Sequence, residues 1–373
     1  MKFHILKCSK NNVGKRLCCI TEWGSKTDLQ LDTPLCMIYT RAGHIPHLTG
    51  DALDVTCLIR DSSVWHMSLP TSAWSSFQID TDTFELLQRQ LQVDCFQAFC
   101  DADTPPDASA TRCRKAVDRT ISFASTSLEI GNKLSADVFA SIVGGREKFE
   151  LRRCCRQLAK LPFQGYMFEG FHGYGQLTDF KVSSVANLLQ HCLDTLPKEL
   201  PRFFPGALDP TQVLELVDLG CDLFDSSYAY LLTKKGQALV LDESFPAEPK
   251  FHLIDDFDVL CADCTCYTCS GSKYTKAYLN HLMVTHELLG PVLLQMRHGI
   301  YPDQPQNTAD DDKFIEFYRE FLDETKAAHI SYSRAWYEKL FKVLILGYAA
   351  IFSRIGHKIK TGFVDGLKRL RIK

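Results

Sequence analysis

The sequence predicts an α/β protein made of consecutive strand–helix units, and two observations carry this prediction. From Phe96 onward, short apolar runs alternate with longer segments in which apolar residues recur at helical spacing. The chain also has 373 residues, of which 45% are hydrophobic and 23% charged, the composition of a globular protein with a sizeable core. Several such units in a row imply parallel strands with right-handed crossovers, hence a doubly wound sheet or a (β/α)8 barrel.

The first 80 residues have a different pattern. "RLCCITEW", "PLCMIYT" and "SVWHMSLP" are typical of strands, and turn-rich segments such as "RAGHIPHLTGD" separate them. We expect an antiparallel start to the fold.

The strand–helix units then follow in order. Strands are predicted at 95–100, 138–145, 165–171 and 202–208, and the helices after them at 111–129, 148–161, 181–196 and 209–220. In the second helix we expect Phe149, Leu151, Cys155, Leu158 and Leu161 to lie near one face.

The last of these helices has the clearest boundaries. Asp209 is the expected N-cap, Pro210 the first helical residue, Gln212 the capping-box partner and Gly220 the residue just past the end.

The cysteines argue against a secreted, disulfide-linked protein. There are 16 of them, but the N-terminal "MKFHILKCSKNN" has no apolar stretch long enough for a signal peptide, so we expect reduced thiols. Isolated thiols such as Cys36, Cys57, Cys192 and Cys221 are expected to be buried as small hydrophobic side chains.

Charge is concentrated at the C-terminus. Residues 353–373 hold seven Lys/Arg and one Asp, whereas the whole chain has a net charge of −3. The preceding "VLILGYAAIF" has ten residues, about half of what a membrane crossing needs. The segment is therefore interpreted as a C-terminal helix packed on its own domain, an interfacial helix or a basic arm for RNA.

Four cysteines fall within nine residues of "CADCTCYTCS". Cys264, Cys266 and Cys269 form C-x-C-x2-C, and a tetrahedral Zn²⁺ needs one further ligand. The helix-like segment that follows offers His281, His286 and His298, while Cys261 is a competing thiol. Three thiolates and one imidazole make a closed structural site and leave no open position for catalysis.

The segment "CTCYTCSGSKYTKAYLNHLMVTHELLGPVLL" resembles the zinc segment of the tRNA-guanine transglycosylase (queuine tRNA-ribosyltransferase) family. "DTPLCMIYTRAGHIPHLT", "FCDADTPP", "RKAVDRTISFA" and "CDLFDSSYAYLLTKKGQA" resemble further family segments in the same order. The resemblance covers roughly residues 30–300. It implies a TIM-type (β/α)8 barrel with an inserted zinc-binding subdomain.

The resemblance also implies domain limits and ligands. The N-terminal β segment would span residues 1–30, the barrel 31–300 with its zinc subdomain at about 261–300, and a helical extension with a basic tail 301–373. One Zn²⁺ would be bound by Cys264, Cys266, Cys269 and His298, although the family spacing falls on Arg297 and leaves His286 in reserve.

The activity implied by the family is the exchange of guanine for queuine at the wobble position of tRNA. Asp225 stands at the position of the nucleophile and Asp101 at that of a carboxylate that contacts the incoming base. Both follow predicted strands, where a barrel has its active site. The proton-transfer aspartate of "TDSGGFQ", however, has no counterpart between Pro46 and Pro70.

Other family positions are altered as well. Val143-Gly144-Gly145 replaces "QQG", Glu169-Gly170-Phe171 replaces "GGL", and Lys234 and Lys235 stand where arginines would contact RNA. These changes resemble the non-catalytic accessory branch of the family.

We therefore expect a subunit that pairs with a catalytic subunit, helps to position tRNA, and is cytoplasmic or peripheral on the mitochondrial outer membrane through its basic tail. The segment holding Leu282, Leu288, Leu289 and Leu293 is interpreted either as part of the subunit interface or as simple core. The alternative function is an active transglycosylase with Asp225 as nucleophile and Asp51 or Asp54 in proton transfer.

Overall fold

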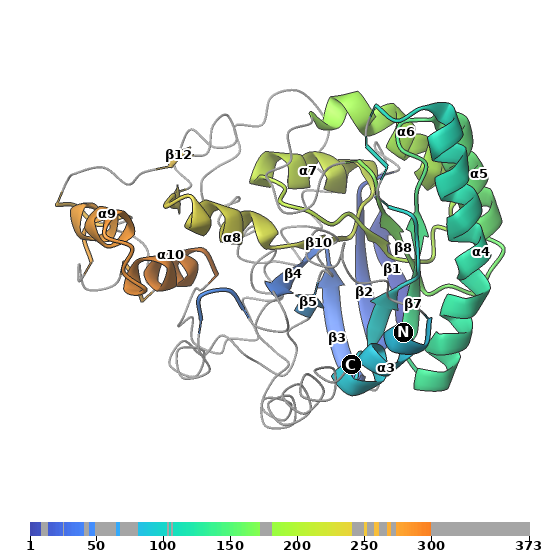
Figure 1. The fold of residues 1–373 in the computed structure, drawn as a ribbon, viewed down its shortest axis with the longest axis horizontal. Coiled ribbons are helices and arrows are strands. Elements are labelled where there is room, and N and C mark those ends of the chain that lie inside the picture. Colours follow the sequence, from blue (N-terminus) through green and yellow to red (C-terminus); the bar gives the residue numbers. More distant parts are fainter. Residues whose placement is uncertain are drawn as a thin grey trace, which may run out of the picture.

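A parallel sheet forms the centre of the computed structural model (Figure 1). The structure describes residues 1–8, 14–24, 26–40, 45–48, 65–67, 81–102, 104–105, 107–171, 181–240, 250–251, 257–260, 267–269 and 274–299. The seven strands of the sheet are β4 (Leu35–Thr40), β5 (Trp65–Met67), β6 (Cys95–Gln97), β7 (Asp137–Ile142), β8 (Gly165–Phe168), β9 (Arg202–Phe203) and β10 (Leu223–Asp225).

The strand order is β5-β4-β10-β9-β8-β7-β6, and every neighbouring pair is parallel. The first strand of the sheet, β4, therefore lies beside the last, β10. Side chains of β4, β7, β8, β9 and β10 meet in one buried cluster, so the sheet is curled. Within the described residues, β5 and β6 are its two edges.

Helices follow the strands. The sequence predicts four of them, α4 (Ala110–Leu134), α5 (Lys148–Leu158), α6 (Val182–Thr195) and α7 (Pro210–Leu219), and the structure adds α3 (Thr81–Leu91) and α8 (Ser227–Lys234). The boundaries of α7 are confirmed: Asp209 accepts a hydrogen bond from the Gln212 backbone, Gln212 completes the capping box, and Gly220 ends the helix with φ 107°.

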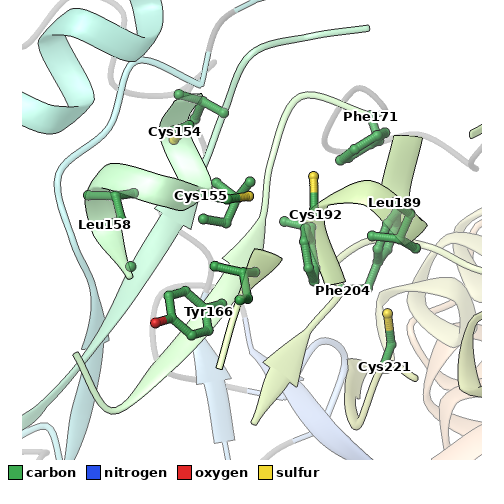
Figure 2. Packing of buried hydrophobic residues seen from close by; sticks show 14 of the residues in the cluster. Cys154, Cys155, Leu158, Tyr166, Phe171, Leu189, Cys192, Phe204 and Cys221 are labelled. Carbon is green, nitrogen blue, oxygen red and sulfur yellow. The ribbon is translucent and has the colours of Figure 1, made fainter. Parts of the chain in front are cut away.

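One core lies between the sheet and helices α4 to α7 (Figure 2). The thiols of Cys154, Cys155, Cys192 and Cys221 are buried in it beside aromatic rings such as Phe204. The prediction for Cys192 and Cys221 is thus confirmed, since free buried thiols pack as small hydrophobic groups. Cys36 is only partly buried, and Cys57 lies outside the described residues.

A three-stranded antiparallel sheet precedes the parallel one, in the order β1 (Lys2–Cys8), β2 (Arg16–Trp23) and β3 (Lys26–Thr33). Arg16 fixes it to the main sheet, because its guanidinium donates two hydrogen bonds to the buried Asp222 carboxylate, at 2.8 and 2.5 Å. Side chains of β2 and β3 also enter the cluster inside the curled sheet.

Three details of the sequence-based expectation are wrong. β4 and β5 belong to the parallel sheet and not to the antiparallel start, because β10 and β4 supply their partners. Phe149 is 74% exposed, since at about 100° per residue it lies roughly 160° around α5 from the buried Leu151. α5 also ends at Leu158, before Leu161.

Beyond the sheet lie α9 (Lys276–Val284) and α10 (Leu289–Gly299), with the short pair β11 (Leu239–Val240) and β12 (Lys250–Phe251). α9 and α10 pack on each other through Leu279, Leu282, Leu293 and Leu294 and have their own small core. Figure 1 places them at the end of the molecule opposite α4 and α5. None of the described helices has the length and apolar composition needed to cross a bilayer.

Candidate functional site

The carboxyl ends of the parallel strands bring the predicted site residues to one edge of the sheet. Asp225 is the last residue of β10, Asp101 follows β6, and Glu169 directly follows β8. The C-terminal edge of such a sheet is where α/β proteins bind substrates. The structure thus supports the expected location of Asp101 and Asp225.

Asp225 is enclosed by hydrogen-bond partners, and its side chain is only 3% exposed. Oδ1 accepts from the backbone N–H and the hydroxyl of Ser227, at 2.9 and 2.5 Å. Oδ2 accepts from the Gly206 N–H at 3.0 Å and lies 3.3 Å from Nδ1 of His66, an ion-pair distance without hydrogen-bond angles.

A carboxylate offers about four lone-pair directions, and three of them accept hydrogen bonds here. A nucleophile needs at least one lone pair that faces its substrate. Oδ1 has both directions occupied, and Oδ2 faces the Gly206 N–H and the His66 ring, so within the described residues the geometry of Asp225 is that of a structural anion.

The pKa of Asp225 agrees with this arrangement. Burial acts to raise it, but the His66 imidazole, the Ser227 hydroxyl and the Gly206 N–H outweigh burial and hold the pKa below its ordinary value. His66 is itself held by an edge-to-face contact with Phe203, at 5.0 Å between ring centroids. The carboxylate is therefore ionised at neutral pH and paired.

Asp101 is held by two arginines of the helix that follows it. Arg112 donates to both carboxylate oxygens, at 2.9 and 2.5 Å, and Arg119 adds a third contact at 2.8 Å. Burial acts to raise the pKa of Asp101, but the hydrogen bonds and charges of the two arginines lower it by more, so the pKa is below its usual range. A carboxylate so occupied would have to break charge-assisted bonds before it contacted a base.

The segment that would receive the purine is filled by protein groups. The Glu169 carboxylate is buried and accepts from the Gln97 amide at 2.7 Å, while the same amide contacts Ser141 and Cys100. Phe171 is buried against Phe204, with 5.8 Å between ring centroids. The charge and the ring expected at this point are both present in the interior.

Sequence reasoning missed four residues of this edge: His66, Gln97, Arg112 and Arg119. The two arginines carry a local signal, because they lie in the first three turns of the helix after Asp101. His66 is far from Asp225 in sequence, and only the strand order β5-β4-β10 brings them together.

The residues expected to contact RNA lie at the end of α8, and those of the rival mechanism are outside the described part of the chain. Lys234 is the last residue of α8, Lys235 follows it, and both are exposed. Asp51 and Asp54 lie outside the described residues.

Part of the cysteine cluster can be placed. Cys269 is buried in the small core with Leu293 and Leu294 of α10, and the Thr268 hydroxyl donates to the Leu293 carbonyl at 2.7 Å. The turn carrying Cys269 is thus fixed to α10, the helix that also carries His298. Cys264, Cys266 and the side chain of His298 lie outside the described part of the chain.

The other candidate zinc ligands are exposed, and the leucine segment is partly buried and partly exposed. His281 and His286 are exposed. Leu282 and Leu293 are core, whereas Leu288 is 86% and Leu289 39% exposed. Tyr278 and Val284 are exposed as well, and these four residues are together called the α9–α10 surface below.

Comparison with known proteins identifies the family. The family model for queuine tRNA-ribosyltransferase matches residues 75–302, and that for cytochrome c oxidase assembly factor 8 matches residues 294–356. The chain is 32% identical to "Queuine tRNA-ribosyltransferase accessory subunit 2" of Drosophila grimshawi over 81% of this chain and 86% of the relative. It is 30% identical to the protein of the same name from Ixodes scapularis, over 73% and 86%.

The first match spans more than half of the chain, and the relatives are covered over most of their length. The ordered motifs, the curled parallel sheet and the carboxylates at its edge agree with that match. The chain belongs to the queuine tRNA-ribosyltransferase family.

Proposed function

We propose that this chain is the non-catalytic accessory subunit of a queuine tRNA-ribosyltransferase. In a heterodimer with a catalytic subunit, it supports the exchange of guanine for queuine at the wobble position of tRNA. We also propose that the chain folds as a (β/α)8 barrel, which the curled seven-stranded parallel sheet supports. The edges of that sheet in the described residues are β5 and β6.

The observation that carries the proposal is the state of the two retained aspartates. Asp225 is buried, accepts three hydrogen bonds and has the His66 ring beside Oδ2, and Asp101 is held by Arg112 and Arg119. Base exchange needs a carboxylate free to attack the ribose and a second group to move protons. Neither aspartate offers this, and the names of the relatives agree with an accessory role.

The α9–α10 surface is the proposed contact with the catalytic subunit. Val284 is 69% and Leu288 86% exposed, and the two lie four residues apart between the end of α9 and the start of α10. Exposed apolar side chains that lie close together are typical of interfaces. The buried Leu282 and Leu293 support the helices from beneath, so the leucine segment serves both as core and as surface.

We also propose one Zn²⁺ held by Cys264, Cys266, Cys269 and His298. Three thiolates with one imidazole suit tetrahedral zinc, and the Thr268 bond to α10 keeps the Cys269 turn beside the helix of His298. The metal would supply a structural crosslink in this subdomain.

Metal analysis tests this site. Cys269→Ser and His298→Ala should each lower the zinc content of the purified chain from about one equivalent, whereas the exposed His286→Ala should not. Equal zinc in His298→Ala and the unaltered chain would exclude His298 as a ligand.

Lys234 and Lys235 are proposed to contact tRNA weakly, since they are exposed at the end of α8.

Localisation in the cytoplasm, with peripheral contact to the mitochondrial outer membrane through the basic tail, stays a prediction. Fractionation of cells expressing the chain truncated after Phe352 tests it: unchanged membrane recovery would contradict a role of the tail.

The decisive experiment measures incorporation of labelled guanine or queuine into a substrate tRNA. The chain alone, a catalytic subunit alone and their mixture are compared. We expect activity in the mixture above that of the catalytic subunit and none from this chain alone. Exchange by this chain alone would instead support the alternative, in which Asp225 is a nucleophile.

A further inference from the structure

A second surface, distant from the α9–α10 surface, is strongly basic. Residues 110–160 contain eleven Lys/Arg and five Asp/Glu, a net charge of +6, whereas the whole chain has −3. This segment comprises α4, β7 and α5, and the two helices lie side by side on the outside of the sheet (Figure 1).

Six cations of this segment are exposed and have no hydrogen bond or ion pair from their side chains to any described residue. We call them the α4–α5 basic face: Arg114, Lys115, Arg146, Lys148, Arg152 and Arg156. Lys148, Arg152 and Arg156 recur every four residues along α5, about 6 Å apart along the helix axis. These three side chains form a row on the solvent side of the helix.

The neighbouring acidic groups are largely neutralised within the protein. Arg153 bonds Glu150 and, across to α4, Asp118 at 2.8 Å, and it also donates to the Arg114 carbonyl at 3.2 Å. These bonds fix α5 against α4. Of the other nearby carboxylates, Asp101 is held by two arginines, and Glu147 is half-buried at the start of α5.

The N-terminal turns of α4 and α5 follow the carboxyl ends of β6 and β7. The basic face therefore borders the same edge of the sheet as Asp101. It also lies at the opposite end of the molecule from α9 and α10, so it stays open when the α9–α10 surface is covered by a partner (Figure 1).

A row of cations without partners among the described residues fits a polyanion. A bilayer surface requires a continuous apolar face, but the solvent side of α5 has one exposed aromatic ring, Phe149, among its charges. Phosphates of RNA are matched by arginines and lysines, and a nearby aromatic ring adds a stacking platform for an unpaired base.

We propose that the α4–α5 basic face binds the phosphate backbone of tRNA. The proposal rests on the proposed function, because it takes tRNA as the RNA in question. It gives this subunit an RNA contact that does not use the altered pocket at the strand ends.

The test uses the full chain and a fluorescein-labelled tRNA transcript, with anisotropy measured from 50 to 200 mM KCl. The variant is Arg152→Gln/Arg156→Gln, which removes two side chains without described partners. The matched control is Lys181→Gln/Lys198→Gln, two exposed lysines likewise without described side-chain partners. Melting temperatures check that both variants remain folded.

The α5 variant should weaken tRNA binding at least about fivefold at 100 mM KCl and reduce the slope of log K against log salt by about 1.4–1.8, since each of the two lost phosphate contacts contributes about 0.7–0.9. The control should stay within about twofold. Affinity and slope equal to the unaltered chain would overturn the proposal.

Two further measurements separate this proposal from others. Loss of binding to phosphatidylserine vesicles with unchanged tRNA affinity would assign the face to a membrane and overturn the proposal. Loss of heterodimer on gel filtration would assign it to the catalytic subunit, with the same consequence. Because anisotropy uses this chain alone, it remains decisive even if the chain fails to support base exchange.

Discussion

Replacing Asp225 by Ala should destabilise this protein and leave its support of base exchange intact per folded molecule. The change leaves the backbone N–H groups of Ser227 and Gly206 without their acceptor and removes the carboxylate beside His66. A buried donor left unsatisfied costs about 1–3 kcal/mol, so the two donors together cost about 2–6 kcal/mol of unfolding free energy. At about 2–4 °C per kcal/mol for a domain of 150–250 residues, the melting temperature should fall by roughly 4–24 °C.

The assay pairs thermal unfolding with tRNA exchange. Asp225→Asn keeps the volume and one acceptor oxygen, so its loss should be smaller, about 1–3 kcal/mol. Glu129→Gln on the exposed side of α4 is the matched control and should change stability by less than about 0.5 kcal/mol. Exchange is measured with the catalytic subunit below the melting point of every variant and normalised to purified heterodimer.

A particular result would refute this view of Asp225. If the Asp225→Asn heterodimer melts like the unaltered one but no longer exceeds the catalytic subunit alone in exchange, the carboxylate acts chemically. The four partners around it would then have to open during turnover.

Three further predictions follow from described contacts. Arg16→Met leaves the buried Asp222 carboxylate without its cation and should cost about 3–5 kcal/mol in urea unfolding, and a loss below about 1 kcal/mol would contradict the role given to this pair. Because the folded pKa of Asp101 is lowered, its ionised form stabilises the fold above about pH 4, and this contribution is lost as pH falls through the folded pKa. Arg112→Gln should therefore flatten the acid side of the stability curve and cost about 1 kcal/mol at pH 7, as Arg112 is partly exposed; an unchanged curve below pH 4 would argue against it. Leu288→Asp should leave the melting temperature within about 2 °C but weaken heterodimer formation on gel filtration, and an unaltered heterodimer would remove Leu288 from the interface.

The fold could be predicted where local chemistry decides it. The capping residues of α7 and the short apolar strands β6 to β8 are encoded within a few positions, and they were located correctly. The direction of β4 and β5 could not be predicted, because it depends on a partner, β10, that lies much later in the chain.

The site shows the same division. Asp101 and Asp225 were located through a resemblance between motifs, and their position at strand ends is confirmed. The contact between His66 and Asp225 could not be predicted, because only the strand order β5-β4-β10 brings these two residues together. The contact between Arg112 and Asp101 could have been predicted, because Arg112 lies in the first turn of the helix that follows this strand-end carboxylate.

The position of β10 between β4 and β9 has a consequence for how the protein is made. Leu35 pairs with Leu223, so β4, which has β5 on its other side, gains its second neighbour in the sheet only after most of the chain has left the ribosome. Contacts between such distant residues slow folding, because the loop between them must be ordered first. Until then the edge of β4 that faces β10 and the Arg16 side chain lack their partners, and a nascent chain that stalls before Asp222 exposes the β4 edge to proteolysis and aggregation.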